Sequence, residues 1–387
     1  MVIAKNVILS SMQKEVVEKT QKWFESSTSQ AFVLTGYAGT GKTTCVEYLI
    51  NALNIELNEV SFVAPTGKAS VVITQKAKGN YQASTIHKLI YRIDEFIGFV
   101  LKEKAELKNL KLIICDEASM IDRDLLEDLL SFEIKVLFLG DRGQLEPIGE
   151  KTKLLNKPDA ELTEIHRQAK DNPIIYLSML AREGKSIPPG RYGKSVFVIS
   201  KDTINEKSNE KIIDMASRAD QMICGKNSTR EYFNNVIREK KGIKSPLPVY
   251  GEKMICLRNN WNKTIKDISL VNGIIGYITD IEQQMEKDKV LTRDCIRMNF
   301  KPEFLEESFE NLLILHSSFT GKREILYREE VKLYDKFDFG YCITAHKSQG
   351  SQFGNLLIYD EILNYKNHAQ WKYTAITRAV NNLILIQ

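Results

Sequence analysis

The sequence contains no long hydrophobic run and no closely spaced pair of cysteines. No apolar stretch approaches the roughly 18 to 20 residues of a membrane-spanning helix, and the opening residues MVIAK lack the basic-then-apolar layout of a secretion signal. These absences lead us to expect a cytoplasmic protein without a membrane partner. The cysteines are scattered, form no CxxC pair and lie mostly in apolar segments, which predicts reduced core thiols rather than zinc ligands or disulfides: Cys45, Cys115, Cys224, Cys256, Cys295 and Cys342.

Proline is scarce, and neither a low-complexity tract nor an internal repeat is present. With 9 prolines in 387 residues, 43% hydrophobic and 27% charged residues, the composition is that of a globular protein rather than a disordered one. At roughly 100 to 200 residues per domain, this length predicts two or three folding units.

Acidic residues are missing from one long segment. Residues 61–93 contain no Asp or Glu but do contain Lys68, Lys76, Lys78, Lys88 and Arg92. The net charge of +4 is too small to indicate a partner, whereas this local excess of positive charge predicts a surface that faces an anion.

A phosphate-binding loop is the first motif that carries chemistry. Residues 36–43 (GYAGTGKT) match GxxxxGK[ST], follow a short apolar run at 31–34 and precede apolar residues at helical spacing. Glycines let backbone amides approach phosphates, the lysine reaches the outer phosphates, and Thr43 ligates Mg²⁺. We therefore predict ATP and Mg²⁺ as cofactors, with nucleotide contacts from Gly36, Gly39, Thr40, Gly41, Lys42, Thr43 and Thr44.

Further apolar runs at 60–64, 110–115 and 134–139 predict parallel strands buried on both faces, and thus an α/β domain. The second run ends in Asp116 and Glu117. Alone, such a pair is equally consistent with a solvated turn. Behind a strand and downstream of a phosphate loop, it predicts a hydrolysis site in which Asp116 holds Mg²⁺ and Glu117 orients or deprotonates water.

The third run ends in residues 140–148 (GDRGQLEPI), a segment that resembles helicase motif III. Together with DEAS at 116–119, it makes the chain similar to superfamily 1 helicases, specifically the RecD-like and Dda-like branch that moves 5′ to 3′. The resemblance implies that Gln144 contacts the γ-phosphate and links its presence to the DNA site. It also implies an α/β fold of two tandem RecA-like P-loop domains with parallel sheets.

Other nucleotide-side residues follow from the same resemblance. Residues 9–13 (LSSMQ) resemble the N-terminal glutamine motif, in which Gln13 hydrogen-bonds adenine. Residues 162–168 (LTEIHRQ) and 371–379 (WKYTAITRA) resemble the segments whose arginines reach the γ-phosphate, here Arg167 and Arg378. A guanidinium suits this task because it stays charged and planar, although a surface salt bridge is the alternative for each arginine. Gln349 would reach the nucleotide from motif V.

The DNA-side motifs lie in three segments. Residues 64–69 are similar to motif Ia and 84–88 to the DNA-contact motif that follows, both within the acid-free segment, while 341–350 (YCITAHKSQG) resemble motif V. A lone His87 is more often a structural histidine, but this context favours a DNA contact. The implied DNA-binding residues are Pro65, Thr66, Lys68, Thr85, His87, Thr344, His346 and Lys347.

The family resemblance also predicts two insertions. A hairpin at about 88–106 occupies the place of the duplex-splitting pin, with Phe96 or Phe99 as either a stacking wedge or a packing residue. Residues 247–335 resemble an SH3-like β-barrel inserted in the second domain. The expected domains are 1–166, and 167–246 with 336–387; Arg230 and Asn234, in a motif IV-like segment, are expected to be scaffold.

These motifs predict an ATP-dependent DNA helicase that translocates on single-stranded DNA in replication, recombination or repair. The alternative is a translocase that remodels protein–DNA complexes without efficient unwinding; a small-molecule P-loop kinase would leave motifs III and V and Arg378 unused. Expected partners are single-stranded DNA and single-strand/duplex junctions, with single-strand-binding, replication or recombination proteins as candidates. We expect a monomer, located in the host cytoplasm if a phage encodes it.

Overall fold

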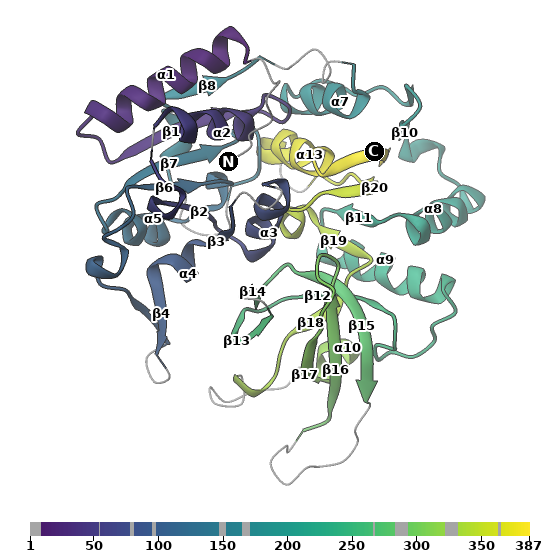
Figure 1. Cartoon of the computed structure of the whole chain (residues 1–387). Helices are drawn as coiled ribbons and strands as arrows, with labels where there is room; N and C mark the ends of the chain where they lie inside the picture. The colour runs from purple at the N-terminus through teal and green to yellow at the C-terminus, as the bar shows by residue number, and fades with distance from the viewer. Residues whose placement is uncertain are drawn as a thin grey trace. The chain divides into compact units, whose positions relative to one another are not determined.

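The computed structural model describes residues 9–53, 55–77, 81–94, 98–146, 152–164, 171–265, 268–282, 293–321, 332–362 and 365–387. The chain divides into two compact units, labelled by element in Figure 1. The first comprises residues 1–187 and 364–377, and the second 188–363 and 378–387. The C-terminal segment is therefore divided between the two units at Arg378.

The first unit is built on a six-stranded sheet in which every neighbouring pair is parallel. Its strand order is β3 (Ala83–Thr85), β2 (Val60–Ala64), β6 (Leu112–Cys115), β7 (Lys135–Gly140), β1 (Ala31–Gly36) and β8 (Ala160–Leu162). The helices of this unit are α1 (Ser11–Ser26), α2 (Lys42–Ala52), α3 (Gly67–Lys76), α4 (Ile86–Ile90), α5 (Arg123–Leu130), α7 (Pro173–Arg182) and α13 (His368–Ile376). The short 3-10 helices are η1 (Leu57–Glu59), η2 (Lys104–Leu107), η3 (Ala118–Met120), η4 (Leu154–Asn156) and η6 (Tyr365–Asn367).

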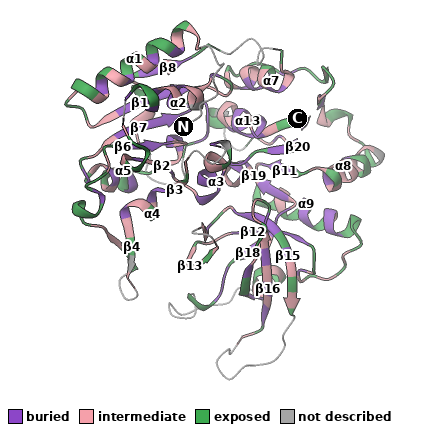
Figure 2. Cartoon of the chain, in the orientation of Figure 1, coloured by how far each residue is buried: buried purple, intermediate pink, exposed green. Residues whose placement is uncertain are grey.

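Both faces of this sheet are buried. Along β1, Phe32 and Leu34 pack in a core cluster with residues of α1 and α2, while Val33 packs in a second cluster with residues of α4 and α5. Figure 2 shows the resulting buried strands beside helices that keep exposed residues. This is the burial expected of a parallel sheet covered by helices on both sides, and it explains why its strands appear as continuous apolar runs in the sequence.

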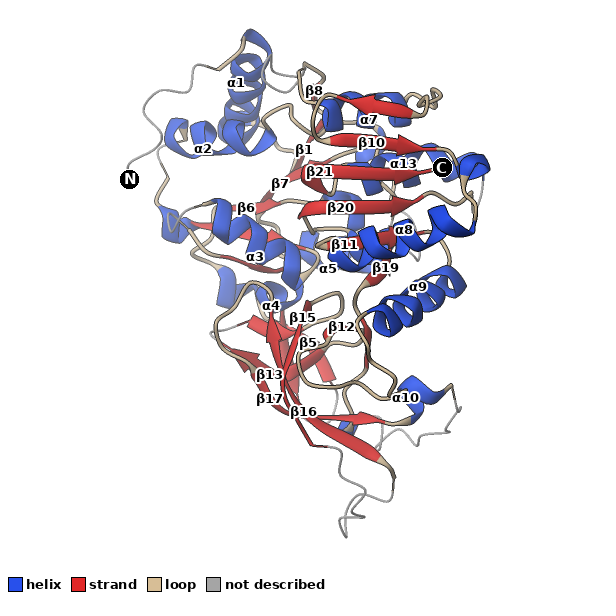
Figure 3. Ribbon diagram, turned by 90° about the vertical axis from the view of Figure 1, so that its right-hand side faces the viewer, coloured by secondary structure: helices blue, strands red, loops and turns tan. Residues whose placement is uncertain are grey.

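The second unit contains another six-stranded sheet, parallel except for its last pair. Its order is β19 (Cys342–Thr344), β11 (Gln221–Cys224), β20 (Phe353–Tyr359), β21 (Ala379–Ile386), β10 (Val196–Ile199) and β9 (Gly190–Tyr192). The helices η5 (Lys201–Thr203), α8 (Glu206–Arg218), α9 (Asn227–Lys240) and α12 (Ala345–Ser348) also belong to this unit. Side chains of α8 and α9 share a core cluster with β11, β19 and β20, and Figure 3 shows these two helices on one face of the sheet.

An antiparallel sheet is inserted between α9 and β19. Its order is β17 (Phe309–Leu315), β16 (Cys295–Pro302), β15 (Ile275–Glu282), β12 (Lys253–Cys256) and β18 (Phe337–Phe339). The pair β13 (Asn260–Ile265) and β14 (Ile268–Leu270) and the short helix α10 (Ser317–Thr320) accompany it. Its core cluster includes Met254, Phe300 and Phe337, so the insertion has an apolar core of its own.

Several sequence predictions are confirmed. The apolar runs at 31–34, 60–64, 110–115 and 134–139 correspond to β1, β2, β6 and β7, all parallel. The strands β4 (Tyr91–Asp94) and β5 (Gly98–Leu101) pair antiparallel inside the predicted hairpin segment. All six cysteines are free and buried. The predicted domain limits differ from the two compact units, whose first division falls after Ile187, and they stay predictions.

Among the described residues, no helix is both long enough and apolar enough to span a membrane.

Candidate functional site

The phosphate loop joins β1 to α2 in the first unit, as its motif requires. Gly39 and Gly41 both have φ +80°, a left-handed conformation that favours glycine. Gly41 is the N-cap of α2, and no side chain that the structure describes caps that helix end. The first amides of α2 therefore point out of the helix at its positive end, where a phosphate binds favourably.

Lys42 and Gln13 bind the same loop. Lys42 Nζ donates hydrogen bonds to the carbonyl oxygens of Gly36 and Tyr37. The Gln13 amide donates to the carbonyl of Thr40 at 3.2 Å, and its Oε1 accepts from the backbone N–H of Ser10 at 3.1 Å. Gln13 thus joins the start of α1 to the phosphate loop, and its predicted contact with adenine stays a prediction.

Asp116 and Glu117 follow the end of β6. In the sheet, β6 is next to β7, and β7 is next to β1, the strand that leads into the phosphate loop. Glu117 has φ 54° and ψ 38°, a left-handed backbone that costs a non-glycine residue about 1–2 kcal/mol. Such strained residues cluster at functional sites. Asp116 Oδ1 accepts a hydrogen bond from the Glu117 N–H at 2.7 Å. A carboxylate at this strand end fits the oxygen ligands that Mg²⁺ prefers, so Asp116 would hold the ion that screens the phosphate charge. The side chain of Thr43 lies outside the described part.

The loop that carries Gln144 follows β7. Asp141 Oδ1 accepts from the Gly143 N–H at 2.9 Å, and the Gln144 N–H donates to the Asp141 carbonyl at 3.2 Å. The Gln144 side chain is buried, and its Oε1 has no hydrogen-bond partner within the described residues. A buried polar atom without a hydrogen-bond partner needs an explanation, and contact with a ligand would be one for Gln144.

Two residues of α13 contact these loops, although the sequence analysis did not assign them a role. Tyr373 Oη donates to Asp141 Oδ2 at 2.6 Å and accepts from the Ala38 N–H at 3.0 Å. Thr374 Oγ1 accepts from the Leu145 N–H at 2.8 Å. Both residues lie within the segment that resembles motif VI, but only the arginine of that segment carried an expectation.

Arg182, at the end of α7, is another residue that the sequence analysis missed. Its guanidinium carbon lies 3.5 Å from the ring centroid of Tyr37, in the phosphate loop. The stacked pair brings a permanent positive charge to the loop. No motif marks Arg182, because the contact depends on the packing of α7.

The predicted DNA residues of the first unit occupy two helix starts. Thr66 caps α3 by accepting from the Ala69 N–H, and Thr85 caps α4 by accepting from the Lys88 N–H. Pro65 precedes the first cap, and Lys68 is buried. Each threonine hydroxyl thus has a structural partner as well as its predicted role.

An aromatic cluster lies beside Thr85. The His87 ring centroid is 5.5 Å from that of Tyr91 and 5.8 Å from that of Phe99, and Phe99 is 43% exposed. Burial lowers the pKa of His87, with Asp122 opposing the shift. The lowered pKa favours the uncharged ring of His87.

In the second unit, Arg378 and Gln349 are both buried. The Arg378 guanidinium donates to the carbonyl of Ser351 at 3.4 Å, and the Arg378 carbonyl accepts from the Phe353 N–H at 2.8 Å. These contacts fix the arginine beside the segment that carries Gln349.

The motif V residues Thr344, His346 and Lys347 lie where β19 passes into α12. Lys347 Nζ donates to Asn272 Oδ1 at 2.7 Å, in the turn between β14 and β15. Burial lowers the pKa of both His346 and Lys347. The inserted segment therefore holds the end of the Lys347 side chain.

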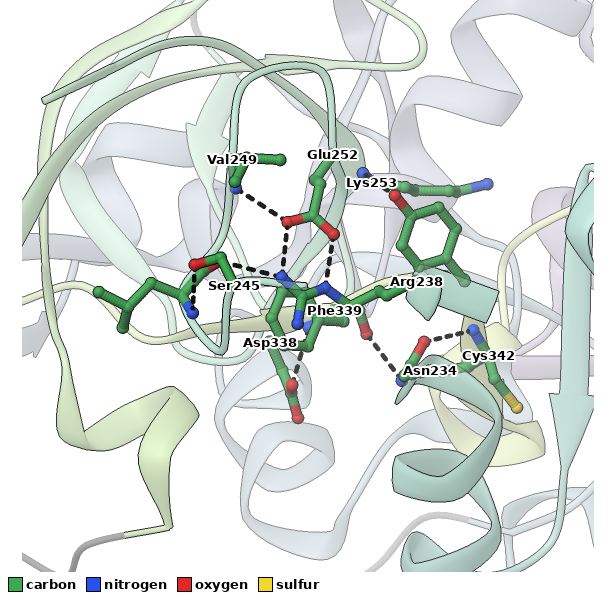
Figure 4. A network of polar contacts seen from close by, with 11 residues as sticks. Asn234, Arg238, Ser245, Val249, Glu252, Lys253, Asp338, Phe339 and Cys342 are labelled. Carbon is green, nitrogen blue, oxygen red and sulfur yellow. Dashed lines mark hydrogen bonds and ion pairs between the residues drawn. The ribbon is translucent and has the colours of Figure 1, made fainter. Parts of the chain in front are cut away.

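A buried polar network joins α9 to the strands that lead to motif V (Figure 4). Arg238 Nε lies 2.7 Å from Glu252 Oε1, with both side chains buried. The Asn234 amide donates to the carbonyls of Phe339 and Cys342 and accepts from the Cys342 N–H. Asn234 thus acts as scaffold, as its motif predicted, and fixes the strand that precedes Thr344.

Three predicted site features lie outside what the structure describes: Arg167, Phe96 and the side chain of Thr43. The other predicted nucleotide residues divide between the units, with Gln13, Lys42, Glu117 and Gln144 in the first and Arg378 in the second.

Comparison with known families agrees with this arrangement. Residues 8–197 match the AAA domain family, and residues 339–386 match the UvrD-like helicase C-terminal domain family. The chain belongs to the superfamily 1 helicases of the RecD and Dda branch. It is thus a member of a family of ATP-dependent DNA helicases.

Characterised relatives match over different lengths. The chain is 34% identical over 169 residues to the ATP-dependent DNA helicase Dda of Enterobacteria phage T4, covering 39% of this chain and 38% of that protein. It is 25% identical over 370 residues to the ATP-dependent RecD2 DNA helicase of Deinococcus radiodurans, covering 90% of this chain and 45% of that protein. The chain therefore spans less than half of the length of these two relatives.

A solved structure shares the fold. The Pif1 helicase from Bacteroides, solved in complex with ADP-AlF3 and single-stranded DNA, matches with a TM-score of 0.56 at 19% identity, covering 98% of this chain and 92% of that one. At this identity the likeness shows the fold alone. The α/β units with parallel sheets are consistent with tandem RecA-like domains.

Proposed function

We propose that the chain is an ATP-dependent DNA helicase that translocates along single-stranded DNA in the 5′ to 3′ direction. The observation that carries the proposal is the physical link between the phosphate loop and the Gln144 loop. Tyr373 hydrogen-bonds both Ala38 and Asp141. A simple phosphotransferase needs a phosphate loop but has no use for a second loop that senses the nucleotide and is tied to it.

In this proposal ATP binds at the phosphate loop, where Lys42 and the first amides of α2 contact its phosphates. Glu117 deprotonates or orients water, and Gln144, Arg167 and Arg378 stabilise the charge of the transferring phosphoryl group. Gln13 selects adenine, and Gln349 contacts the nucleotide from motif V. Thr43 and Asp116 would hold Mg²⁺, which would supply positive charge to the phosphates when bound.

The strand is held mainly through its phosphates and sugars and by stacking, so binding is tolerant of sequence and sensitive to salt. We assign these contacts to the eight predicted DNA residues. The β4–β5 hairpin serves as the strand-separating pin with Phe99 as its wedge, and the antiparallel insertion serves as the SH3-like module. The RecA-like domains are proposed at 1–166, and at 167–246 with 336–387.

Matched duplexes with a 5′ or a 3′ single-stranded tail test this function. We expect ATP-dependent unwinding of the 5′-tailed duplex, whereas activity on the 3′-tailed duplex alone would overturn the direction. Turnover and displacement of bound protein without strand separation would instead favour the remodelling translocase. A Phe99→Ala variant separates the steps, because it should lose unwinding while it keeps single-strand-stimulated ATP turnover.

A further inference from the structure

Helix α13 belongs to the first unit, although most of its sequence neighbours do not. Residues 188–363, which precede this segment, and residues from Arg378 onwards belong to the second unit. Within the first unit α13 packs beside α7. It is thus a short piece of the distant C-terminal segment that joins the unit carrying the phosphate loop.

Tyr373 is a deeply buried side chain of this helix, with 1% of its surface exposed. Its hydroxyl donates to Asp141 Oδ2 at 2.6 Å and accepts from the Ala38 N–H at 3.0 Å. The first distance is in the range of charge-assisted O–H···O⁻ hydrogen bonds, which are stronger than neutral ones. Burial, followed by the charge and hydrogen bond of Asp141, raises the pKa of Tyr373, so the hydroxyl keeps its proton and stays a donor.

The Gln144 loop is held by α13 at several points. Asp141 and Leu145, on either side of Gln144, are hydrogen-bonded by Tyr373 and Thr374 respectively. Between them, the Gly143 backbone lies so close to the Tyr373 ring that a Cβ there would come within 2.9 Å of Cε1. The helix that contacts the Gln144 loop thus also accepts a hydrogen bond from Ala38 in the phosphate loop.

We propose that Tyr373 and Thr374 are positioning residues that couple the phosphate loop to Gln144. A shift of the phosphate loop changes the hydrogen bond from Ala38 and is passed through the tyrosine hydroxyl to Asp141 and the Gln144 loop. The same helix ends at Ile376, two residues before Arg378, so the chain carries the shift directly towards the second unit. This inference rests on the proposed function and adds to it the part that links the state of the nucleotide to DNA-stimulated turnover.

Two substitutions remove these contacts with little change in shape. Tyr373→Phe deletes the hydroxyl and keeps the ring beside Gly143. Thr374→Val deletes the acceptor of the Leu145 N–H, and its matched control Thr374→Ser keeps that acceptor. The measurements are kcat and KM for ATP with and without oligo(dT), the affinity for a fluorescent ADP analogue, and the thermal unfolding midpoint of the full chain.

We expect Tyr373→Phe to lower the ratio of DNA-stimulated to basal kcat about tenfold, which corresponds to ~1.4 kcal/mol of lost coupling, while KM and ADP affinity stay within about twofold. Thr374→Val should lower the ratio in the same way, and Thr374→Ser should retain it. A double variant of Tyr373→Phe with Asp141→Asn should be no worse than the more affected single variant, because both substitutions act on the hydrogen bond between Tyr373 and Asp141.

An unchanged ratio in Tyr373→Phe overturns the inference, and so does a fall in basal and stimulated kcat by the same factor together with a lower unfolding midpoint. If Tyr373→Phe fails to fold, the comparison of Thr374→Val with Thr374→Ser decides in the same way. Absence of ATP turnover in the unmodified chain would instead refute the proposed function, so the two failures are distinguishable.

Discussion

Glu117 combines a strained backbone with a place at the end of a buried strand. Its left-handed conformation is one that side-chain-bearing residues rarely adopt. The neighbouring Asp116 carboxylate accepts a hydrogen bond from the Glu117 N–H, which stabilises this backbone conformation. Two adjacent carboxylates therefore follow one buried strand, and the proposed function gives them separate roles in holding Mg²⁺ and activating water.

Lys42 tests whether nucleotide and DNA contacts are separate. Lys42→Ala should abolish ATP turnover, because it removes the cation that the loop supplies to the outer phosphates. Single-strand affinity should stay within about threefold, measured by fluorescence anisotropy at fixed salt, because the proposed DNA residues are different ones. Loss of both properties, together with a lower unfolding midpoint, would indicate misfolding rather than a specific role.

Two half-buried histidines, His87 and His346, predict a pH dependence of stability. Burial lowers the pKa of His87 and of His346. Below the unfolded value of about 6.5, the unfolded chain binds more protons than the folded one, so the free energy of unfolding should decline as pH falls. Each histidine contributes at most about 1.4 kcal/mol per pH unit. Urea unfolding between pH 8 and pH 5.5 measures this decline in the free energy of unfolding. The double variant His87→Gln, His346→Gln should make the free energy of unfolding less dependent on pH. An equally steep dependence would contradict the role of the two histidines.

At the scale of elements, the inserted sheet and motif V are connected through buried polar contacts. Arg238 of α9 pairs with Glu252 just before β12, and its guanidinium carbon lies 3.9 Å from the Phe339 ring centroid in β18. Asn234 of the same helix binds the backbone at Cys342. One helix thus orients both the base of the insertion and the strand that carries Thr344.

The buried pair of Arg238 and Glu252 predicts a large loss of stability when the arginine is replaced. Arg238→Met should lower the free energy of unfolding by about 3–5 kcal/mol, because it leaves the Glu252 carboxylate buried without its partner. The double variant Arg238→Met, Glu252→Gln should recover part of that loss, since the uncompensated charge is removed. Urea denaturation of the two variants makes the comparison, and a single variant within about 1 kcal/mol of the original chain would show that the pair is unimportant.

The sequence predicts those elements that depend on local pattern. The apolar runs identify β1, β2, β6 and β7, and the GxxxxGK[ST] spacing locates the loop between β1 and α2. Tyr373 and Arg182 could not be assigned in this way, because their partners Asp141, Ala38 and Tyr37 are far away in the sequence and meet them only through packing. A tyrosine within a motif VI-like segment was the one available signal for Tyr373. No local sequence pattern predicts that α13 belongs to the first unit.

At the scale of the whole molecule, the residues proposed to contact the nucleotide divide between two compact units. Lys42, Glu117 and Gln144 lie in one, and Arg378 lies in the other, directly after the helix that holds the Gln144 loop. Motifs proposed to contact DNA are divided in the same way, with Thr85 in the first unit and Thr344 in the second. This distribution is what a motor needs if hydrolysis is to change how the two units hold one strand.

The rate of ATP hydrolysis as a function of single-strand length tests the central claim most directly. A protein that moves along DNA while it hydrolyses ATP spends a larger fraction of its time in motion on a longer strand. We therefore predict that kcat at saturating oligo(dT) rises with strand length and reaches a plateau. The same kcat on the shortest bound strand and on a long one, or no stimulation by either, would contradict the account.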